Sequence, residues 1–143
     1  LVQQERGRQL KVTDLRKAVE GKFRKLNLSS SQLESGLVAY MGKSAADNMS
    51  LLRKSKPHDI WLHLKDYPSA HAIVHCPKNH SITTSEIDEV SRWLIREGIS
   101  TKVSAENAKI SIVYVQCRYV KPLKGDKLGR VTYHNERQIL IGL

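Results

Sequence analysis

The chain has 143 residues, of which 40% are hydrophobic and 27% charged, a composition typical of one globular domain with a buried core. Its formal net charge of +10 predicts a polyanionic partner, such as RNA, DNA or an anionic membrane surface. No apolar run approaches the roughly 20 residues of a transmembrane helix, so a membrane-embedded protein is not expected.

The first 28 residues are predicted to form a basic helix, because four apolar residues fall near one of its faces. They are Leu15, Val19, Phe23 and Leu26. We expect a solvated helix or the end of a coiled coil, rather than an arm that binds nucleic acid. The polar run 29–32 is typical of a linker, so we predict a basic helical segment and linker at 1–32 and a globular domain at 33–143. Because the chain begins with leucine rather than methionine, we expect a segment of a longer protein.

Residues 37–41 suit a short strand, and a helix is expected from Ser44 to about Arg53. The run Gly42-Lys43-Ser44 is similar to the end of a phosphate-binding P-loop, but five residues rather than four separate Gly36 from Gly42. A nucleotide triphosphatase is therefore not predicted. The helix start beside Lys43 is either an anion site or a plain helix cap.

The segment 59–71 predicts two strands joined by a turn at 66–69. Period two places Ile60, Leu62 and Leu64 on a core face. The opposite face carries Trp61, His63 and Lys65, and His71 follows across the turn. An aromatic ring, imidazoles and an ammonium group suit stacking on bases and contact with phosphate. The alternative is that Trp61 packs under a helix as part of the core.

In the second half, Thr83 and Glu86 predict a capping box that opens a helix ending at Gly98. Residues 110–119 are apolar on both faces, as in a central strand, and a basic loop with two glycines spans 121–130. Two closing strands are expected at 131–134 and 138–142. The predicted fold is an α+β single domain with a mixed, mainly antiparallel sheet packed by two helices and preceded by the basic helix.

The sequence gives little support for a catalytic site or a metal site. His63, His71 and His75 lack the compact spacing of metal ligands, and no Cys-x-x-Cys motif is present. His75 and Cys76 are neighbours in a strand and face apart, which argues against a thiol–imidazole pair. We therefore predict a protein that is not an enzyme and has no cofactor or metal. The two cysteines, without metal-type spacing, favour a reduced, cytoplasmic location.

Three blocks of the sequence together match the pattern of one known family. The first block is Gly42-Lys43-Ser44-Ala45 followed by Asn48. The second runs from Asp59-Ile60-Trp61-Leu62-His63 through Lys65-Asp66-Tyr67-Pro68 to His71. The third is Tyr119-Val120-Lys121 with the basic glycine loop and Val131-Thr132-Tyr133. In their order and spacing these blocks resemble the NFACT-R RNA-binding domain, the C-terminal module of the NFACT proteins of ribosome-associated quality control. The resemblance covers about residues 36–142. The family usually has Pro-Gly-Ser-His where this chain has Pro68-Ser69-Ala70-His71, and one more positive charge at 121–125.

The resemblance implies a module that binds tRNA or ribosomal RNA, within a longer parent that rescues stalled large ribosomal subunits and supports tRNA recruitment for C-terminal tailing. Partners would be the large ribosomal subunit and other domains of the parent chain, with no membrane. Phosphate contacts are expected from Lys43, Lys65, Lys121, Lys124, Lys127 and Arg130, and stacking from Trp61, His63 or His71. The resemblance adds Ser44, Asn48, Asp59, Ser69 and Tyr133. The alternatives are a DNA-binding module, a hydrolase or nuclease using His63 and His71, and a protein-docking hairpin.

Overall fold

The computed structural model describes residues 28–99 and 109–143, so the helix predicted before residue 28 lies outside the described residues. In chain order the elements are β1 (Leu28–Gln32), β2 (Val38–Gly42), α2 (Ala45–Lys54), β3 (Ile60–Leu64), β4 (Ala72–His75), α3 (Thr84–Glu97), β5 (Lys109–Gln116), the 3-10 turn η1 (Cys117–Tyr119), β6 (Val120–Pro122), β7 (Val131–Tyr133) and β8 (Arg137–Gly142). Six strands form one sheet in the order β1-β2-β4-β3-β5-β8, and β6 and β7 form a second, two-stranded sheet. All strand pairs between described residues are antiparallel.

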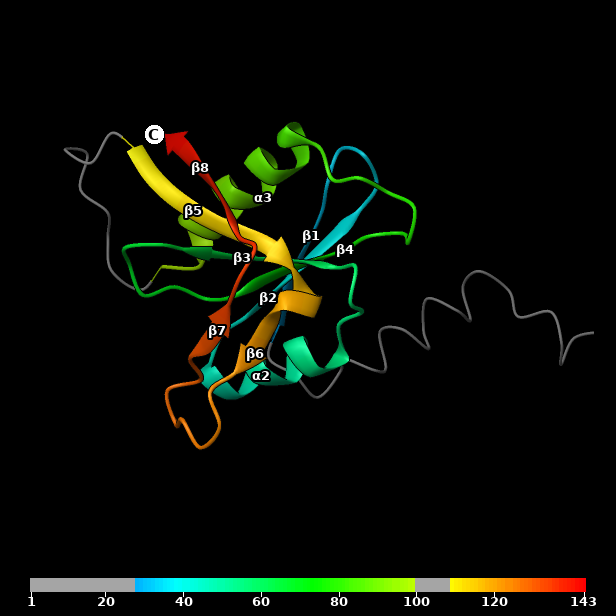
Figure 1. Ribbon diagram of the computed structural model, residues 1–143. Helices are drawn as coiled ribbons and strands as arrows, with labels where there is room; N and C mark the ends of the chain where they lie inside the picture. Colours follow the sequence, from blue (N-terminus) through cyan, green and yellow to red (C-terminus); the bar gives the residue numbers. More distant parts are fainter. Residues whose placement is uncertain (1–27, 100–108) are drawn as a thin grey trace, which may run out of the picture.

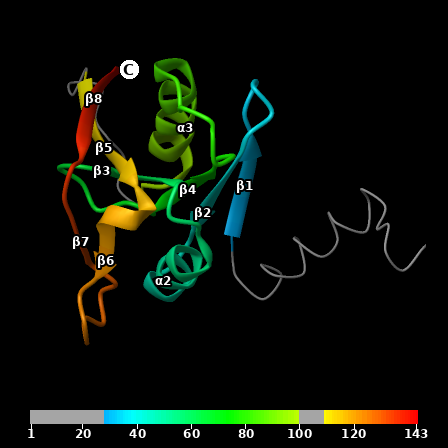
Figure 2. The same ribbon diagram turned by 45° about the vertical axis from the view of Figure 1, so that its right-hand side comes forward.

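The two helices cover opposite faces of the large sheet (Figures 1 and 2). Helix α3 packs on the face that carries Ile60, Leu62 and Leu64, the stripe that the sequence predicts for the core. Helix α2 packs on the other face, where Trp61 belongs to a separate buried cluster with Leu51. This arrangement confirms the predicted α+β domain with a mainly antiparallel sheet and two packing helices.

Both helices begin at the predicted caps. Ser44 Oγ accepts a hydrogen bond from the Asp47 amide at 3.1 Å. Thr83 and Glu86 form the complete capping box, with reciprocal hydrogen bonds of 3.0 and 2.8 Å. Burial would raise the pKa of Glu86, but hydrogen bonds from Ser35, Thr83 and His80 outweigh it and hold the pKa at about 2. The capping carboxylate therefore stays charged and fixes the start of α3.

The predicted linker at 29–32 is instead part of strand β1, the edge strand of the large sheet. Ser30 pairs with Tyr40 and Gln32 with Val38 in an antiparallel register. Backbone pairing with β2 outweighs the weak strand preference of serine, because an edge strand exposes part of its surface and tolerates polar side chains. The sheet therefore begins before the boundary predicted near residue 33.

The end of the chain also differs from the prediction. The strand expected at 110–119 stops at Gln116 and continues as η1. The two closing strands do not pair with each other: β7 pairs with β6, whereas β8 pairs with β5 in the large sheet. Asn135, at a φ of 60°, lies in the turn between them. The second sheet places the basic loop between β6 and β7, near α2.

Candidate nucleic-acid interface

A groove of about 1230 Å³ opens on the α2 side of the sheet. The N-terminus of α2 and the loop between β6 and β7 form one end, where Gly129 lies against Ala45. The turn between β3 and β4 and the end of α3 form the other, joined by a 2.9 Å hydrogen bond from the Ala70 amide to the Gly98 carbonyl. Predicted site residues that line the groove are Lys43, Ser44, Asn48, Trp61, His63, Lys65, Ser69, His71, Arg130 and Tyr133.

Four rings are packed together at the floor of the groove. The Trp61 and His63 rings are stacked at 5.7 Å between centroids, with an angle of 7° between their planes. His71 meets Trp61 and His63 edge-on, at 5.3 and 5.2 Å. Tyr133, from β7, lies 5.2 Å from Trp61 with its ring tilted by 41°. We call Trp61, His63, His71 and Tyr133 the ring cluster; it joins β3, the start of β4 and β7.

The prediction that Trp61 faces solvent is wrong, because only 1% of its surface is exposed. The alternative, that the indole packs under a helix, is correct: Leu51 and Leu52 of α2 share its buried cluster. His71, also predicted to be exposed, is buried at 6% exposure. The alternation of side chains along a strand predicted the correct face of the sheet for both residues. That face, however, is covered by α2 and the β6–β7 sheet.

Both imidazoles of the ring cluster are neutral at physiological pH. Burial, together with the nearby charge that His63 would carry, lowers the pKa of His71 to about 3. Burial also lowers the pKa of His63, although hydrogen bonding at Ser69 opposes the shift. The two histidines therefore supply hydrogen-bonding groups and ring faces to the groove, and positive charge comes from lysine and arginine.

The start of α2 is fixed tightly at the groove edge. A Cβ atom at Gly42 would clash with the Asn48 side chain, so only glycine fits there. Asn48 Oδ1 accepts a hydrogen bond of 3.2 Å from the His71 amide, and the Gly42 amide donates to the His71 carbonyl. Asn48 thus ties α2 to the start of β4, a structural task for a residue predicted to bind RNA. Ser44 caps the helix, and Lys43 beside it is exposed.

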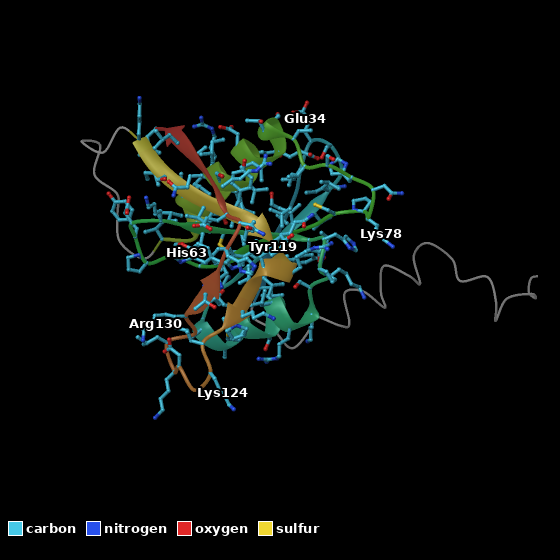
Figure 3. The ribbon with its side chains drawn as sticks, viewed as in Figure 1. Glu34, His63, Lys78, Tyr119, Lys124 and Arg130 are labelled. Atoms are coloured by element: carbon cyan, nitrogen blue, oxygen red, sulfur yellow. The ribbon has the colours of Figure 1, made fainter. Side chains whose placement is uncertain are left out.

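The basic loop after β6 is held in place by Asp126 and Gly129. Asp126 accepts from Arg130 Nε at 2.6 Å and from the Leu128 amide at 2.9 Å. An added Cβ at Gly129 would lie 2.9 Å from Ala45 Cβ, so the loop approaches α2 closely. Figure 3 shows Lys124 and Arg130 projecting from this loop, below His63. Arg130 lines the groove, whereas the exposed side chains of Lys124 and Lys127 belong to the outer rim.

Four predicted residues do not line the groove, namely Asp59, Lys121, Lys124 and Lys127, and the Ser69 hydroxyl is engaged within its own turn. Asp59 is buried, and its carboxylate accepts hydrogen bonds from the Cys76 and Lys56 amides and pairs with His75 Nδ1 at 2.9 Å. Lys121 lies exposed in β6, outside the groove. Ser69 lines the groove, but its hydroxyl closes the turn by accepting from the Leu64 amide and donating to the Ala70 carbonyl. The geometry supports structural tasks for Asp59 and Ser69.

Charge is distributed unevenly along the groove. The cations Lys43 and Arg130 stand at the α2 and β6–β7 end. Asp66 and Glu97 line the other end, together with one cation, Lys65. The α2 end of the groove therefore has two lining cations and no lining carboxylate, although Asp47 lies in the first turn of α2, and it is the better end for a phosphate.

The sequence analysis did not select the apolar residues that border the groove. Leu128 and Leu123 project from the basic loop with 71% and 39% exposure, and both line the groove with Tyr67. The available signal was two leucines within an otherwise charged and glycine-containing loop, an unusual placement for exposed apolar side chains. Such residues suit contact with the faces of bases or sugars.

Two further properties concern only the parts of the chain at 28–99 and 109–143. No three His, Cys, Asp or Glu side chains there are grouped closely enough to hold a metal ion. Neither helix is long and apolar enough to cross a membrane.

Comparison with known proteins agrees with this geometry. The family described as NFACT protein RNA binding domain matches residues 23–135, which include β1 and the whole groove. The chain is 29% identical over 105 residues to the coiled-coil domain-containing protein 25 homolog of Dictyostelium discoideum, covering 71% of this chain and 50% of that protein. It is 26% identical over 115 residues to the Rqc2 homolog RqcH of Bacillus subtilis, covering 80% of this chain and 19% of that protein.

A solved structure shares the fold. It is the C-terminal part of the fibronectin/fibrinogen-binding protein from Streptococcus suis, with a TM-score of 0.67 and 17% sequence identity. The similarity covers 80% of this chain and 45% of that one. The chain thus spans about half the length, or less, of the relatives it matches.

Proposed function

The chain belongs to the NFACT RNA-binding domain family, and on that basis we propose that it binds tRNA or ribosomal RNA within a longer protein of ribosome-associated quality control. In this proposal the parent engages large ribosomal subunits that hold a stalled peptidyl-tRNA, and helps recruit tRNA for C-terminal tailing of the stalled chain. The setting would be cytoplasmic. Similarity to the bacterial Rqc2 homolog supports the pathway, and family membership supports RNA as the ligand.

The observation that carries the proposal is the groove that combines a cationic end with packed rings. Lys43 and Arg130 face the space beside the first turn of α2, and the ring cluster forms the floor. Lys124 and Lys127 are exposed in the loop that supplies Arg130 to the groove, and they add positive charge there. RNA is recognised by this pairing of phosphate contacts with aromatic surfaces.

We propose that the domain binds RNA without a catalytic step. A His71 imidazole with a pKa of about 3 is too weak a base to take a proton from a ribose hydroxyl at neutral pH. Burial raises the pKa of Cys76 to about 11 and that of Cys117 to about 12, so both thiols stay protonated and poorly nucleophilic. These values argue against the nuclease and thiol chemistries weighed above.

The test is RNA affinity measured over a series of salt concentrations. We expect the affinity for tRNA to fall steeply as the salt concentration rises. Lys124→Ala should reduce the slope of log affinity against log salt concentration by about one, the loss of one phosphate contact. Lys78→Ala is the matched control, because Lys78 is exposed, does not line the groove and lies well away from Lys124 (Figure 3). Affinity that does not change with salt would contradict the proposal. A DNA competitor of matched sequence tests the DNA-binding alternative, since only RNA offers the 2′-hydroxyl.

A further inference from the structure

Tyr133 is the ring of the cluster that a ligand can reach most readily. It is 37% exposed at the end of β7, whereas Trp61 is 1% exposed and His71 6% exposed. The Tyr133 ring leans on the indole at 5.2 Å between centroids, so its orientation is supported from below. A supported and exposed ring is a platform on which a flat ligand can stack.

Two polar atoms in the ring cluster lack a hydrogen-bond partner among the described residues. They are Trp61 Nε1 and His71 Nδ1, and both side chains are more than nine-tenths buried and line the groove. Buried polar groups are nearly always paired, so unpaired ones need an explanation such as a ligand. Trp61 Nε1 can only donate, and the carbonyl oxygens and ring nitrogens of a base are acceptors. Both atoms are covered in the free protein, so a ligand reaches them only if the neighbouring rings shift on binding.

The same groove offers a place for one phosphate. Lys43 is exposed beside the first turn of α2, and Gly129 brings the loop that carries Arg130 against Ala45. Asp126 already neutralises much of the Arg130 charge, so Lys43 is the main cation at this end. At the other end Asp66 and Glu97 outnumber the one lining cation, Lys65, and disfavour an anion. A ligand with one anionic and one aromatic part therefore has a defined orientation.

We infer that the groove binds one unpaired nucleotide of a single-stranded RNA segment, with its base on Tyr133 and its phosphate between Lys43 and the first turn of α2. The inference rests on the RNA-binding function proposed above and specifies the form of RNA. A base inside a duplex has both faces covered by its neighbours and its polar edge paired, so it cannot reach the ring. An unpaired base exposes both its face and its hydrogen-bonding edge.

The experiment compares three probes of matched length by fluorescence anisotropy: a 12-nucleotide oligouridine, a 12-mer of abasic ribose phosphates, and a 12-base-pair RNA duplex. Tyr133→Leu keeps an apolar contact on Trp61 and removes the flat ring. We expect it to weaken oligouridine binding by roughly fivefold to 150-fold and to leave binding of the abasic strand unchanged. Tyr119→Leu is the matched control, because Tyr119 does not line the groove. Circular dichroism checks that both variants are folded.

A second measurement follows the fluorescence emission of Trp61. The chain has two tryptophans, and Trp93 lies on the α3 side of the sheet. In a Trp93→Phe variant, Trp61 is the single tryptophan reporter. We expect oligouridine to change its emission, and the abasic strand to bind without that change.

The outcomes separate this inference from the function on which it rests. Equal affinity for duplex and oligouridine, or equal losses on oligouridine and the abasic strand with Tyr133→Leu, would overturn the single-nucleotide pocket while RNA binding stands. No binding of any probe or of tRNA at low salt would overturn the proposed function itself.

Discussion

The two faces of the large sheet are built from the same strands but carry different types of side chain. On the α3 side, β3 contributes Ile60, Leu62 and Leu64 to an apolar layer closed by α3. On the α2 side, the same strand contributes Trp61 and His63 to a layer that mixes rings, imidazoles and unpaired polar atoms, and that opens into a groove. One face of β3 is therefore closed in the core, and the other contributes to the groove that we propose as the RNA-binding site.

The difference arises from what covers each face. Helix α3 is fourteen residues long and lies along the sheet, whereas α2 is shorter and shares its face with the small β6–β7 sheet. The groove runs from these two covers, which meet where Gly129 lies against Ala45, to the turn between β3 and β4. Neighbouring positions in β3 therefore allow the two faces to be tested separately.

The largest effect is expected for Trp61→Ala. Removing a ring that is 1% exposed leaves a cavity and should cost about 3–5 kcal/mol in the free energy of unfolding. Because Tyr133 and His63 rest on the indole, the folded fraction should also bind RNA more weakly. Urea denaturation and RNA titration of the same preparation measure the two losses. If the folded variant bound RNA with unchanged affinity, the ring cluster would not contribute to RNA binding.

Leu62→Ala, at the adjacent position, is expected to affect stability alone. Leu62 is fully buried on the α3 side, and truncation should cost about 2–5 kcal/mol. Leu62 does not line the groove, so RNA affinity below the unfolding transition should remain that of the unsubstituted protein. A loss of affinity comparable to that of Trp61→Ala would show that the two faces are not independent.

The α2 side should also make the fold sensitive to mild acid. The pKa of His71, about 3 in the folded protein against an ordinary 6.5, is lowered by burial and by His63. Between these values the unfolded chain binds the proton more readily, so stability is fully present above pH 6.5 and is lost as pH falls. We expect a slope of roughly 1 kcal/mol per pH unit from this residue, with the lowered pKa of His63 adding in the same direction.

The window from pH 6.5 to 5 isolates this effect, because the lowered pKa values of Glu86 and Asp59 act at lower pH. His71→Gln should flatten the dependence of stability on pH, whereas His134→Gln, at an exposed position, should not. A folded protein whose His71 ring titrates near pH 6 in NMR spectra would contradict the buried, neutral imidazole.

The smallest effect concerns the two loop glycines. Gly125 and Gly129 both have positive φ, 77° and 71°, so alanine at either should cost about 1–2 kcal/mol of backbone strain. Only at Gly129 does the new methyl group also meet Ala45, so Gly129→Ala should displace the loop and weaken RNA binding, while Gly125→Ala should not. Equal RNA affinities of the two variants would mean that contact of the loop with α2 does not position it.

Much of the fold could be predicted because its signals are local. The caps at Ser44 and Thr83 and the stop at Gly98 are set by hydrogen bonds within one turn. The apolar side chains at alternate positions of 60–64 predicted which face of β3 packs against the core, because successive side chains of a strand point to opposite faces. Strand β1 was missed because a serine-rich edge strand has no local preference for extended structure and depends on its partner β2.

For the site, the sequence determined which side chains share a face and that the surface is positively charged, since both follow from periodicity and composition. Only the tertiary structure decided which of those side chains are exposed. Burial of Trp61 and His71 depends on α2 and on the β6–β7 sheet, which pack over their face, and the β6–β7 sheet is distant in the chain. One end of the groove is formed by the basic loop, which approaches Ala45 at Gly129 across a long sequence separation, a contact that no local pattern encodes.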